Sequence, residues 1–338
     1  MKLPTLIILA AAVSLSQGIT ITTAQTCNSD GEVQFLCGPI NPEDLAPVPQ
    51  SPWLIVSSRE GHLYLADTRD HTSTVLFPTE TSQPQHDTTT YGGCPGPLTS
   101  QFRPHGINLH LGNSGNDTLL VVGHGGRESI EAFKFDAGGT SPTLTWIGCV
   151  VAPESLGLNS VVALPEGGFV TTSSRTGDLW EWHTGSGWNL VPGSENIGPN
   201  GLEISRDGRW LYVGGHPDKS LIRLSRGQTP IQKATVAVGF HVDNVRWGPD
   251  ETLLAAGHLG KGGTRAAIGK CTQQRQCDGM TSRVAKVDPL LLTVEEIVRY
   301  PSNDFLVLGT VAIQVGEEIW VGGVGGGNRI ARFPAPTK

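Results

Sequence analysis

Residues 201–224 read GLEISRDGRWLYVGGHPDKSLIRL. Three short apolar runs (201–204, 210–213 and 220–224) are separated by two turns that contain Gly and Asp, with Pro in the second. Apolar runs bounded by such residues are typical of successive β-strands joined by tight turns. This stretch therefore predicts three neighbouring antiparallel strands.

The same kind of unit recurs along the chain. Spaced by 53, 55, 40, 44 and 66 residues, its six copies begin near Trp53, Gly106, Val161, Gly201, Val245 and Val311. Repeats of this length with several strands each are typical of β-propeller blades, whereas a β-sandwich would not repeat its strands in threes and fours. The longest spacing holds a Gly-rich insertion around Cys271 and Cys277, which we expect to be a loop on one face. We predict an all-β fold, a six-bladed β-propeller, as a single domain over residues 25–338.

The composition agrees with this fold and excludes other classes. Glycine fills 44 of the 338 positions, and the tight turns and crowded backbones of a propeller need its conformational freedom. Hydrophobic residues make up 38% of the chain, which is enough for a core and excludes overall disorder. The formal net charge is -7 and there is no basic run, so nucleic acid is not an expected partner.

The N-terminal segment has the features of a secretory signal peptide. Lys2 precedes an almost wholly apolar run over residues 3–15, and residues 22–24 are small enough for cleavage before Gln25. The run is shorter than the ~20 apolar residues that cross a bilayer, and a retained membrane anchor is the alternative. We expect residues 1–24 to be removed and the mature protein to be secreted, without stable insertion into a membrane.

All six cysteines follow the expected cleavage site, which agrees with an oxidising compartment. Six cysteines allow ~15 pairings. The pairs that their positions suggest are Cys27–Cys37, Cys271–Cys277 and, as a possible third, Cys94–Cys149. Zinc is the alternative, but no Cys-x-x-Cys or His pairing at ligand spacing supports it. Asn116-Asp117-Thr118 is an acceptor sequon for N-linked glycan, as expected of a secreted glycoprotein.

In a propeller the innermost strands converge on the axis, so polar residues just before those strands meet there. This rule selects Glu43, His105, Asn159, Asn200 and the pair Asp243-Asn244. Carboxylate and amide oxygens dominate, and such hard donors suit Ca²⁺, whose two charges the two carboxylates balance. Zn²⁺ would prefer nitrogen or sulfur. Each residue alone also fits a turn, a loop cap or a solvated side chain. The recurrence of an oxygen donor at one blade position is what indicates calcium.

Several motifs, taken in order, resemble the paraoxonase/arylesterase proteins and, more distantly, the senescence-marker/gluconolactonase and strictosidine-synthase-like propellers. These motifs are Asn41-Pro-Glu-Asp-Leu45, Pro104-His-Gly-Ile107, Val121-Val-Gly-His124, Glu131-Ala-Phe-Lys-Phe135, Leu158-Asn-Ser-Val161, Pro199-Asn-Gly-Leu-Glu-Ile-Ser-Arg-Asp-Gly208 and Val242-Asp-Asn-Val245. The similarity runs from Glu43 to Phe333 and covers nearly all of the expected mature chain.

The resemblance implies a calcium-dependent hydrolase whose substrate is a small-molecule lactone or aryl ester. By motif match, the calcium ligands would be Glu43, Asn159, Asn200, Asp243 and Asn244. The family's histidine pair, proposed there to activate water, would be His105 and His124. The chemistry is coherent, because Ca²⁺ polarises an ester carbonyl while a neutral imidazole accepts a proton from the attacking water.

Two departures from the family pattern change these expectations. Ser160 stands where paraoxonases carry an acidic ligand of a second, structural calcium. Asp44 and the carbonyl of Ile107 still match that site, so we expect the second ion to be absent or loosely bound. No cysteine follows Cys277, so the family's disulfide between the first and last strands cannot form. Ring closure must then rest on strand pairing.

Two other functions remain open at this stage. The same metal-centred propeller could catalyse a non-hydrolytic reaction (a lyase, isomerase or condensation reaction), as strictosidine-synthase-like relatives show by analogy. A non-catalytic, secreted binding propeller is the third hypothesis. Retention of all five expected ligands counts against it, because buried carboxylates without a cation are costly. The pair of His105 and His124 favours the hydrolase.

Overall fold

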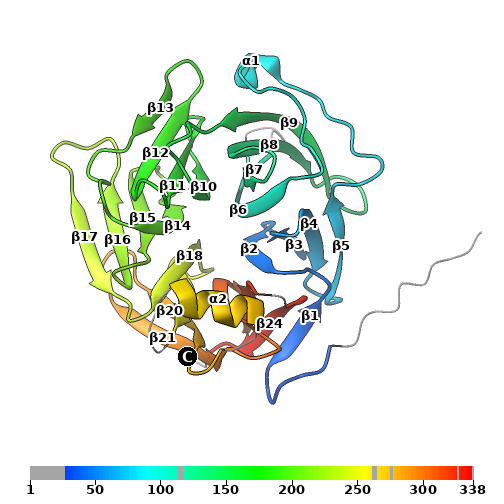
Figure 1. The fold of residues 1–338 in the computed structure, drawn as a ribbon, viewed down its shortest axis with the longest axis vertical. Coiled ribbons are helices and arrows are strands. Elements are labelled where there is room, and N and C mark those ends of the chain that lie inside the picture. Colours follow the sequence, from blue (N-terminus) through cyan, green and yellow to red (C-terminus); the bar gives the residue numbers. More distant parts are fainter. Residues whose placement is uncertain (1–26, 113–116, 261–264, 275–276, 326, 337–338) are drawn as a thin grey trace, which may run out of the picture.

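The computed structural model describes residues 27–112, 117–260, 265–274, 277–325 and 327–336. Six antiparallel sheets of four strands stand as blades around a common axis, which confirms the predicted all-β, six-bladed propeller (Figure 1). We number the blades by their innermost strands, which contact one another around the axis. These are β2 (Pro42–Pro47), β6 (Arg103–His110), β10 (Leu158–Ala163), β14 (Pro199–Ile204), β18 (His241–Trp247) and β22 (Gly309–Val315).

The other strands follow outward in sequence order, except that the N-terminal β1 is the outermost strand of the sixth blade. The second strands are β3 (Trp53–Ser58), β7 (Thr118–His124), β11 (Phe169–Ser173), β15 (Trp210–Gly215), β19 (Leu253–Leu259) and β23 (Glu318–Gly323). The third strands are β4 (His62–Asp67), β8 (Ser129–Asp136), β12 (Asp178–His183), β16 (Ser220–Ser225), β20 (Thr281–Val287) and β24 (Arg329–Pro334). The outermost strands are β5 (Thr72–Phe77), β9 (Thr143–Val151), β13 (Gly187–Leu190), β17 (Lys233–Ala237), β21 (Val294–Pro301) and β1 (Gln34–Cys37).

The ring closes by strand pairing, as the cysteine pattern led us to expect. The N-terminal β1 pairs antiparallel with β24, with Gln34 opposite Arg332, so the sixth blade joins both ends of the described chain. Hydrophobic side chains fill the spaces between blades; Leu54 of blade 1 and Trp320 of blade 6 belong to one buried cluster. Burying both sheet faces in this way fixes each blade against its neighbours.

The first blade begins one strand earlier than the sequence repeat predicted. We expected its unit to start near Trp53, but that residue begins β3, and the innermost strand is β2. The β2 sequence, PEDLAP, has two prolines and two acidic residues, yet its first five residues are all buried. Such a strand lacks the hydrophobic pattern by which strands are recognised in a sequence.

Each innermost strand carries a shift in register near its start, as at a β-bulge. The shifts fall between Pro42 and Asp44, Pro104 and Ile107, Leu158 and Val161, Pro199 and Leu202, Val242 and Val245, and Gly309 and Val311. A bulge turns side chains out of the regular pleat and is frequent beside functional sites. The six equivalent bulges therefore form a ring of irregular backbone around the axis.

Two glycines allow neighbouring bulges to approach closely. A Cβ on Gly106 of β6 would lie 2.5 Å from the Asn159 carbonyl oxygen of β10. A Cβ on Gly201 of β14 would lie 2.1 Å from the Asp243 carbonyl oxygen of β18. Real carbon atoms do not come this close, so glycine is required at both positions.

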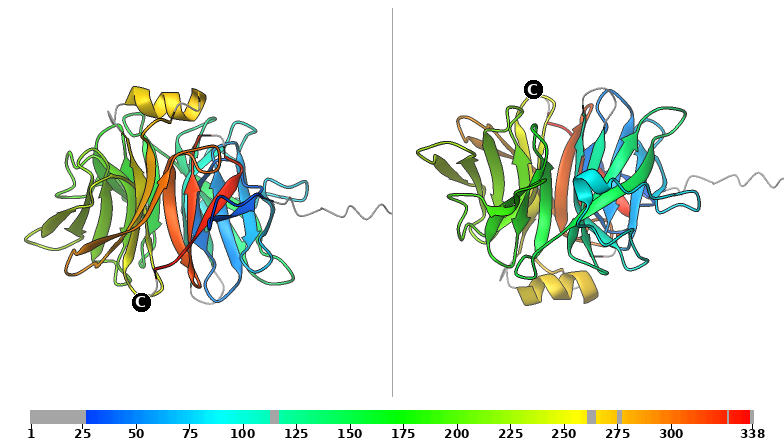
Figure 2. Two further views of the ribbon diagram at one scale, coloured as in Figure 1. Left: turned by 90° about the horizontal axis from the view of Figure 1, so that it is seen from below. Right: turned by 90° about the horizontal axis from the view of Figure 1, so that it is seen from above.

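The three expected disulfides are present, as Cys27–Cys37, Cys94–Cys149 and Cys271–Cys277. The Gly-rich insertion differs from the expected loop, because it contains α2 (Arg265–Gln274), which lies on one face of the ring (Figure 2). A shorter helix, α1 (Thr88–Tyr91), follows β5. Among the described residues, neither helix has the length and apolar character needed to cross a bilayer. The expected signal peptide and Asn116 lie outside the described residues.

Candidate metal centre and histidine pair

The bulges bring together the oxygen-bearing side chains that the sequence selected. They are Glu43 in blade 1, Asn159 in blade 3, Asn200 in blade 4, and Asp243 with Asn244 in blade 5. Asn244 Nδ2 donates a hydrogen bond to Glu43 Oε1 at 3.0 Å across the axis. The Asn200 side chain lies close enough to Asp243 to favour its ionised form. Glu43 and Asn244, which are 201 residues apart in the sequence, thus meet at the axis.

Four of these side chains present a buried oxygen without a partner. Among the described residues, Oε2 of Glu43 and the Oδ1 atoms of Asn159, Asn200 and Asn244 are buried and make no hydrogen bond. An unpaired buried polar atom costs about 1–3 kcal/mol. Unpaired carboxylate and amide oxygens at four of the bulges are the kind of donor that a hard cation binds.

Two buried carboxylates share the centre. Burial raises the pKa of Asp243 well above its ordinary value, and the negative charge of Glu43 raises it further. Burial also opposes ionisation of Glu43, but the charge and hydrogen bond of His105 and the hydrogen bond of Asn244 outweigh it, so the pKa of Glu43 is lowered. Burial and the charge of Glu43 thus both favour the protonated form of Asp243, and a divalent cation between the two carboxylates would favour ionisation of both.

The bulge of blade 6 supplies a residue that the sequence analysis missed. Thr310 in β22 is buried and donates its hydroxyl to the Glu43 backbone carbonyl at 2.7 Å. This bond holds the backbone that presents the Glu43 side chain. Thr310 directly precedes Val311, where a repeat unit was expected to start, so the positional rule applied to that unit would have found it.

The two predicted histidines are in direct contact. His105, at the bulge of β6, places Nδ1 2.8 Å from Nε2 of His124, at the end of β7. Glu128, which the sequence analysis missed, continues the row, because its Oε2 lies 2.8 Å from His124 Nδ1. Its other oxygen accepts the backbone N–H of Leu158 in blade 3 at 2.6 Å. At the opposite end, His105 Nε2 lies 3.4 Å from Glu43 Oε1.

The hydrogen-bond partners determine where the ring protons lie. An ionised carboxylate only accepts, so His124 Nδ1 carries the proton that it donates to Glu128. In neutral His124, Nε2 is then an acceptor, and His105 donates its Nδ1 proton to it. Nε2 of His105 faces Glu43, whose pKa the protonated ring lowers, and in the neutral ring this nitrogen has a free lone pair. A base oriented by a second group in this way is typical of sites that activate water.

Three further histidines gather beside the centre. The ring of His216 lies 5.0 Å from that of His241 and 5.5 Å from that of His258, centroid to centroid. Asn200 Nδ2 lies 3.4 Å from His216 Nδ1, which places the cluster against an expected ligand. Burial lowers the pKa of His258 to about 3, and the two neighbouring histidines add to the effect, so this ring is neutral near neutral pH.

Ser160, which stands where the paraoxonase pattern has an acidic residue, takes part in hydrogen bonds between strands. Its hydroxyl accepts the backbone N–H of Leu202 at 3.2 Å, and its carbonyl accepts the Thr171 hydroxyl at 2.7 Å. Ser160 is fully buried and thus links blade 3 to blade 4 by hydrogen bonds between neutral groups.

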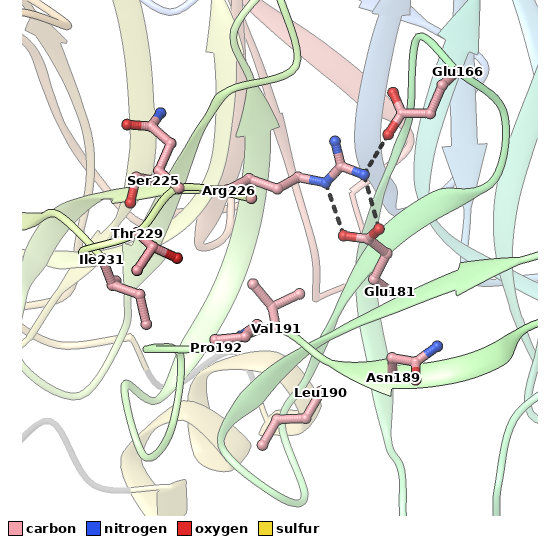
Figure 3. Close-up of a pocket in the computed structure, with 12 residues that line it drawn as sticks. Glu166, Glu181, Asn189, Leu190, Val191, Pro192, Ser225, Arg226, Thr229 and Ile231 are labelled. Atoms are coloured by element: carbon pink, nitrogen blue, oxygen red, sulfur yellow. Dashed lines mark hydrogen bonds and ion pairs between the residues drawn. The ribbon is translucent and has the colours of Figure 1, made fainter.

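A second cluster of possible metal ligands lies away from the axis. Glu166, Glu181 and His183 bring ligand atoms within 4.8 Å of one another, beside a pocket of about 680 Å³ that blades 3 and 4 line (Figure 3). Arg226 donates to both oxygens of Glu181 at 2.8 Å and also contacts Glu166. The oxygens of this cluster thus already have an Arg226 partner. We therefore place the candidate metal centre at the bulges, where the oxygens are unpaired.

A smaller pocket of about 170 Å³ reaches the histidine pair. Leu98 and Phe102 give it an apolar wall beside His124, and Arg127 and Glu131 line its polar side. Both Arg127 bonds to Glu131 are short, at 2.7 and 2.8 Å, so these two charges satisfy each other. The pocket thus offers an apolar surface next to His124.

The fold and the site together define a six-bladed propeller with an oxygen-lined centre at its axis. No protein-family model matches the sequence, and no curated protein matches it. A solved gluconolactonase from Xanthomonas campestris has a TM-score of 0.56 at 15% identity, over 90% of this chain and 89% of its own. A virginiamycin B lyase from Staphylococcus aureus has a TM-score of 0.51 at 12% identity, over 90% and 99%.

A luciferin-regenerating enzyme is also similar, with a TM-score of 0.54 at 14% identity, over 89% of this chain and 94% of its own. At such low identities these likenesses show the fold. The chain therefore has the propeller architecture of gluconolactonase-like and lyase structures, and its resemblance to the paraoxonase/arylesterase branch rests on the sequence motifs alone.

Proposed function

We propose that the chain is a calcium-dependent hydrolase of lactones or aryl esters. The observation that carries the proposal is the set of buried, unpaired oxygens at the bulges, on Glu43, Asn159, Asn200 and Asn244. The row of His105, His124 and Glu128 ends next to these oxygens and supplies a candidate base.

Calcium fits the donor set at the axis. Its five protein residues would be Glu43, Asn159, Asn200, Asp243 and Asn244. Ca²⁺ takes about 6–8 oxygen ligands in tolerant geometry, so five protein oxygens leave room for a substrate oxygen or water. The two carboxylates match the charge of one divalent ion. A transition metal would select more nitrogen or sulfur than this set offers.

The reaction divides between the ion and the histidine row. A bound Ca²⁺ would polarise the substrate carbonyl and stabilise the negative charge that develops on its oxygen. His105 Nε2 accepts a proton from the attacking water, because Nδ1 of the same ring is committed to His124. Glu128 accepts the Nδ1 proton of His124 and so holds that ring in the orientation that receives His105. Leu98 and Phe102 form an apolar wall of the pocket beside His124.

The proposed substrate class rests on two supports. The gluconolactonase among the similar structures supports a lactone, and the sequence motifs add aryl esters. Export is part of the same proposal: three disulfides fit an oxidising compartment, as do the expected signal peptide over residues 1–24 and the sequon at Asn116.

The test is hydrolysis of a panel of lactones and aryl esters by the purified chain, with calcium, after chelation and after calcium is restored. We expect turnover that disappears with the chelator and returns with the ion. Folded, calcium-loaded protein that hydrolyses no member of the panel would refute the hydrolase.

A lyase that uses the same centre is the second candidate. Three of the similar structures are lyases of this fold, and one of them is described as catalytically inactive after a histidine was replaced by alanine. A base such as His105 would serve elimination as well as hydrolysis. Product mass separates the two reactions, because hydrolysis adds one water to the ring-opened product and elimination adds none.

A further inference from the structure

A second cation position adjoins the candidate calcium centre, and a side chain of the protein fills it. Arg246 lies in β18, two residues after Asn244, and is 5% exposed. Its Nη2 contacts the carboxylate of Asp44 and donates to the Ile107 carbonyl at 3.0 Å. Its Nε donates to the Leu45 carbonyl at 3.2 Å. The guanidinium of blade 5 thus reaches across the axis to blades 1 and 2.

The groups around this guanidinium are all oxygen atoms. They comprise the Asp44 carboxylate, the Leu45 and Ile107 carbonyls, and the Val245 carbonyl, which accepts from Nη1 at 2.7 Å. One carboxylate with several backbone carbonyls is a donor set that suits a hard divalent cation. We call these four groups the oxygen cage.

The cage is rigid and closed to solvent. Asp44 is fully buried, and its carboxylate also accepts the backbone N–H groups of Leu45 and Ile107, both at 2.8 Å. Three of its residues lie in innermost strands of blades 1 and 2, and Val245 lies in that of blade 5. Backbone oxygens held by strands of three blades cannot easily move apart when the guanidinium is removed.

We propose that the Arg246 guanidinium is the built-in cation of this oxygen cage, in place of a metal ion, and that shortening its side chain converts the cage into a calcium site. A cation at this position favours the ionised form of Asp44, an acidic group without access to water. Arg is suited to a fixed buried position, since its guanidinium stays protonated and bonds several oxygens at once.

Arg246 also acts as a positioning residue for the candidate calcium centre. It fixes Asp44 and Leu45, which directly follow Glu43 in β2. Loss of the guanidinium would free the strand that carries Glu43 unless another cation took its place. The measured quantity is therefore the number of bound ions. If Arg246 had a purely structural role, its replacement would not increase this number.

The experiment counts calcium ions bound to the full chelator-treated chain by calorimetric titration, with terbium luminescence as a second measure. We expect Arg246→Ala to bind one ion more per chain than the unchanged protein. Arg246→Lys keeps a cation in the cage and should gain none. Asp44→Asn/Arg246→Ala removes the cage carboxylate together with its partner and should also gain none.

This test and the test of the proposed function can fail independently. The proposed function sets only the number of ions that the unchanged protein binds. If that protein binds no calcium and Arg246→Ala binds one, the calcium-dependent hydrolase fails and the cage assignment stands. Two ions in the unchanged protein would overturn the assignment, as would an equal count in folded Arg246→Ala.

Folding of the variant gives the same answer by another route. If Arg246→Ala folds only when calcium is present, the ion replaces the guanidinium, as we propose. If Arg246→Ala stays unfolded in the presence of calcium, the ion does not replace the guanidinium and the proposal is wrong. This conclusion does not depend on whether the double variant folds.

Discussion

His105 Nδ1 and His124 Nε2 lie 2.8 Å apart, and the other ring nitrogen of His124 is hydrogen-bonded to Glu128. The contact joins the bulge of β6 to the end of β7, so the backbone irregularity that presents His105 to the axis also places it against its partner. The base at the centre is therefore positioned by a row of groups, and each of them can be tested separately.

Replacement of His105 by Gln should lower kcat/KM for lactone hydrolysis by about 10²–10⁴-fold, because positioned general bases contribute rate factors of this size. A matched control is His183→Gln, which removes a histidine that also contacts a glutamate, Glu181, on the third strand of blade 3. The control should keep its activity. Unchanged hydrolysis in His105→Gln would remove this histidine from the mechanism.

Glu128→Gln should reduce kcat/KM by about 10–100-fold, the usual loss when a group that orients a functional histidine is replaced. One amide oxygen cannot take over both tasks of the carboxylate, which accepts from His124 and from the Leu158 N–H. We expect His124→Gln to lose activity as well, with calcium affinity unchanged in both variants. A wild-type rate in Glu128→Gln would show that the carboxylate does not support the histidine pair.

Gly201→Ala should weaken calcium binding. The added Cβ would lie 2.1 Å from the Asp243 carbonyl oxygen, so the bulge of β18 must move, and with it two expected ligands. Overpacking of this kind also costs about 1–3 kcal/mol of stability. Gly93→Ala is the control, because no described atom lies within 4 Å of its added Cβ and its φ is ordinary. Equal calcium affinity in the two variants would contradict the close approach of the bulges.

Calcium binding should release a proton. Burial and the charge of Glu43 raise the pKa of Asp243 well above its ordinary value, so a cation that binds the ionised carboxylate displaces a proton wherever the pH lies below that raised pKa. Calcium affinity should then rise with pH until Asp243 ionises in the free protein. Calorimetry in two buffers of different ionisation enthalpy detects the proton, and Asp243→Asn should abolish it. Binding heats that are identical in both buffers would disprove the exchange.

The stability of the chelator-treated protein should depend on Glu203. Burial raises the pKa of Glu203 from 4.5 to about 6, and Arg246 opposes the rise only in part. Between these pH values the folded state keeps a proton that the unfolded state has lost. Unfolding free energy should therefore fall by about 2 kcal/mol as pH rises through this window.

Glu203→Gln should remove this part of the decline. Urea unfolding of both proteins on either side of the window measures the difference. Equal pH slopes in the two proteins would show that Glu203 titrates normally in the folded state.

Much of the architecture could be predicted because local hydrophobic patterns and turn residues indicate the strands. The unit of residues 201–224 became β14, β15 and β16, and the spacing of its copies indicated six blades. The first innermost strand was not predicted because Glu43 and Asp44 interrupt its hydrophobic pattern. The helix α2 was not predicted because the insertion that contains it is rich in glycine, which disfavours helices.

The candidate ligands could be located by their common position in the repeat, but their partners could not. Arg246 contacts Asp44, which is 202 residues away in the sequence, and Glu128 contacts Leu158 in the next blade. Such contacts arise only when the ring closes and leave no periodic signal. Whether a buried oxygen is paired, as at Ser160, or unpaired, as at Asn159, is likewise a property of the folded chain.

The central claim is that hydrolysis depends on a calcium ion held by the axis oxygens. Its most direct test is lactone hydrolysis by chelator-treated protein as calcium is returned, measured side by side for the unchanged chain and Asp243→Asn. We predict that activity returns fully in the unchanged chain and that the variant needs more than ~100-fold more calcium, since even groups that only orient ligands are worth 10–100-fold in metal affinity. Equal calcium requirements, or activity that survives chelation, would contradict the account.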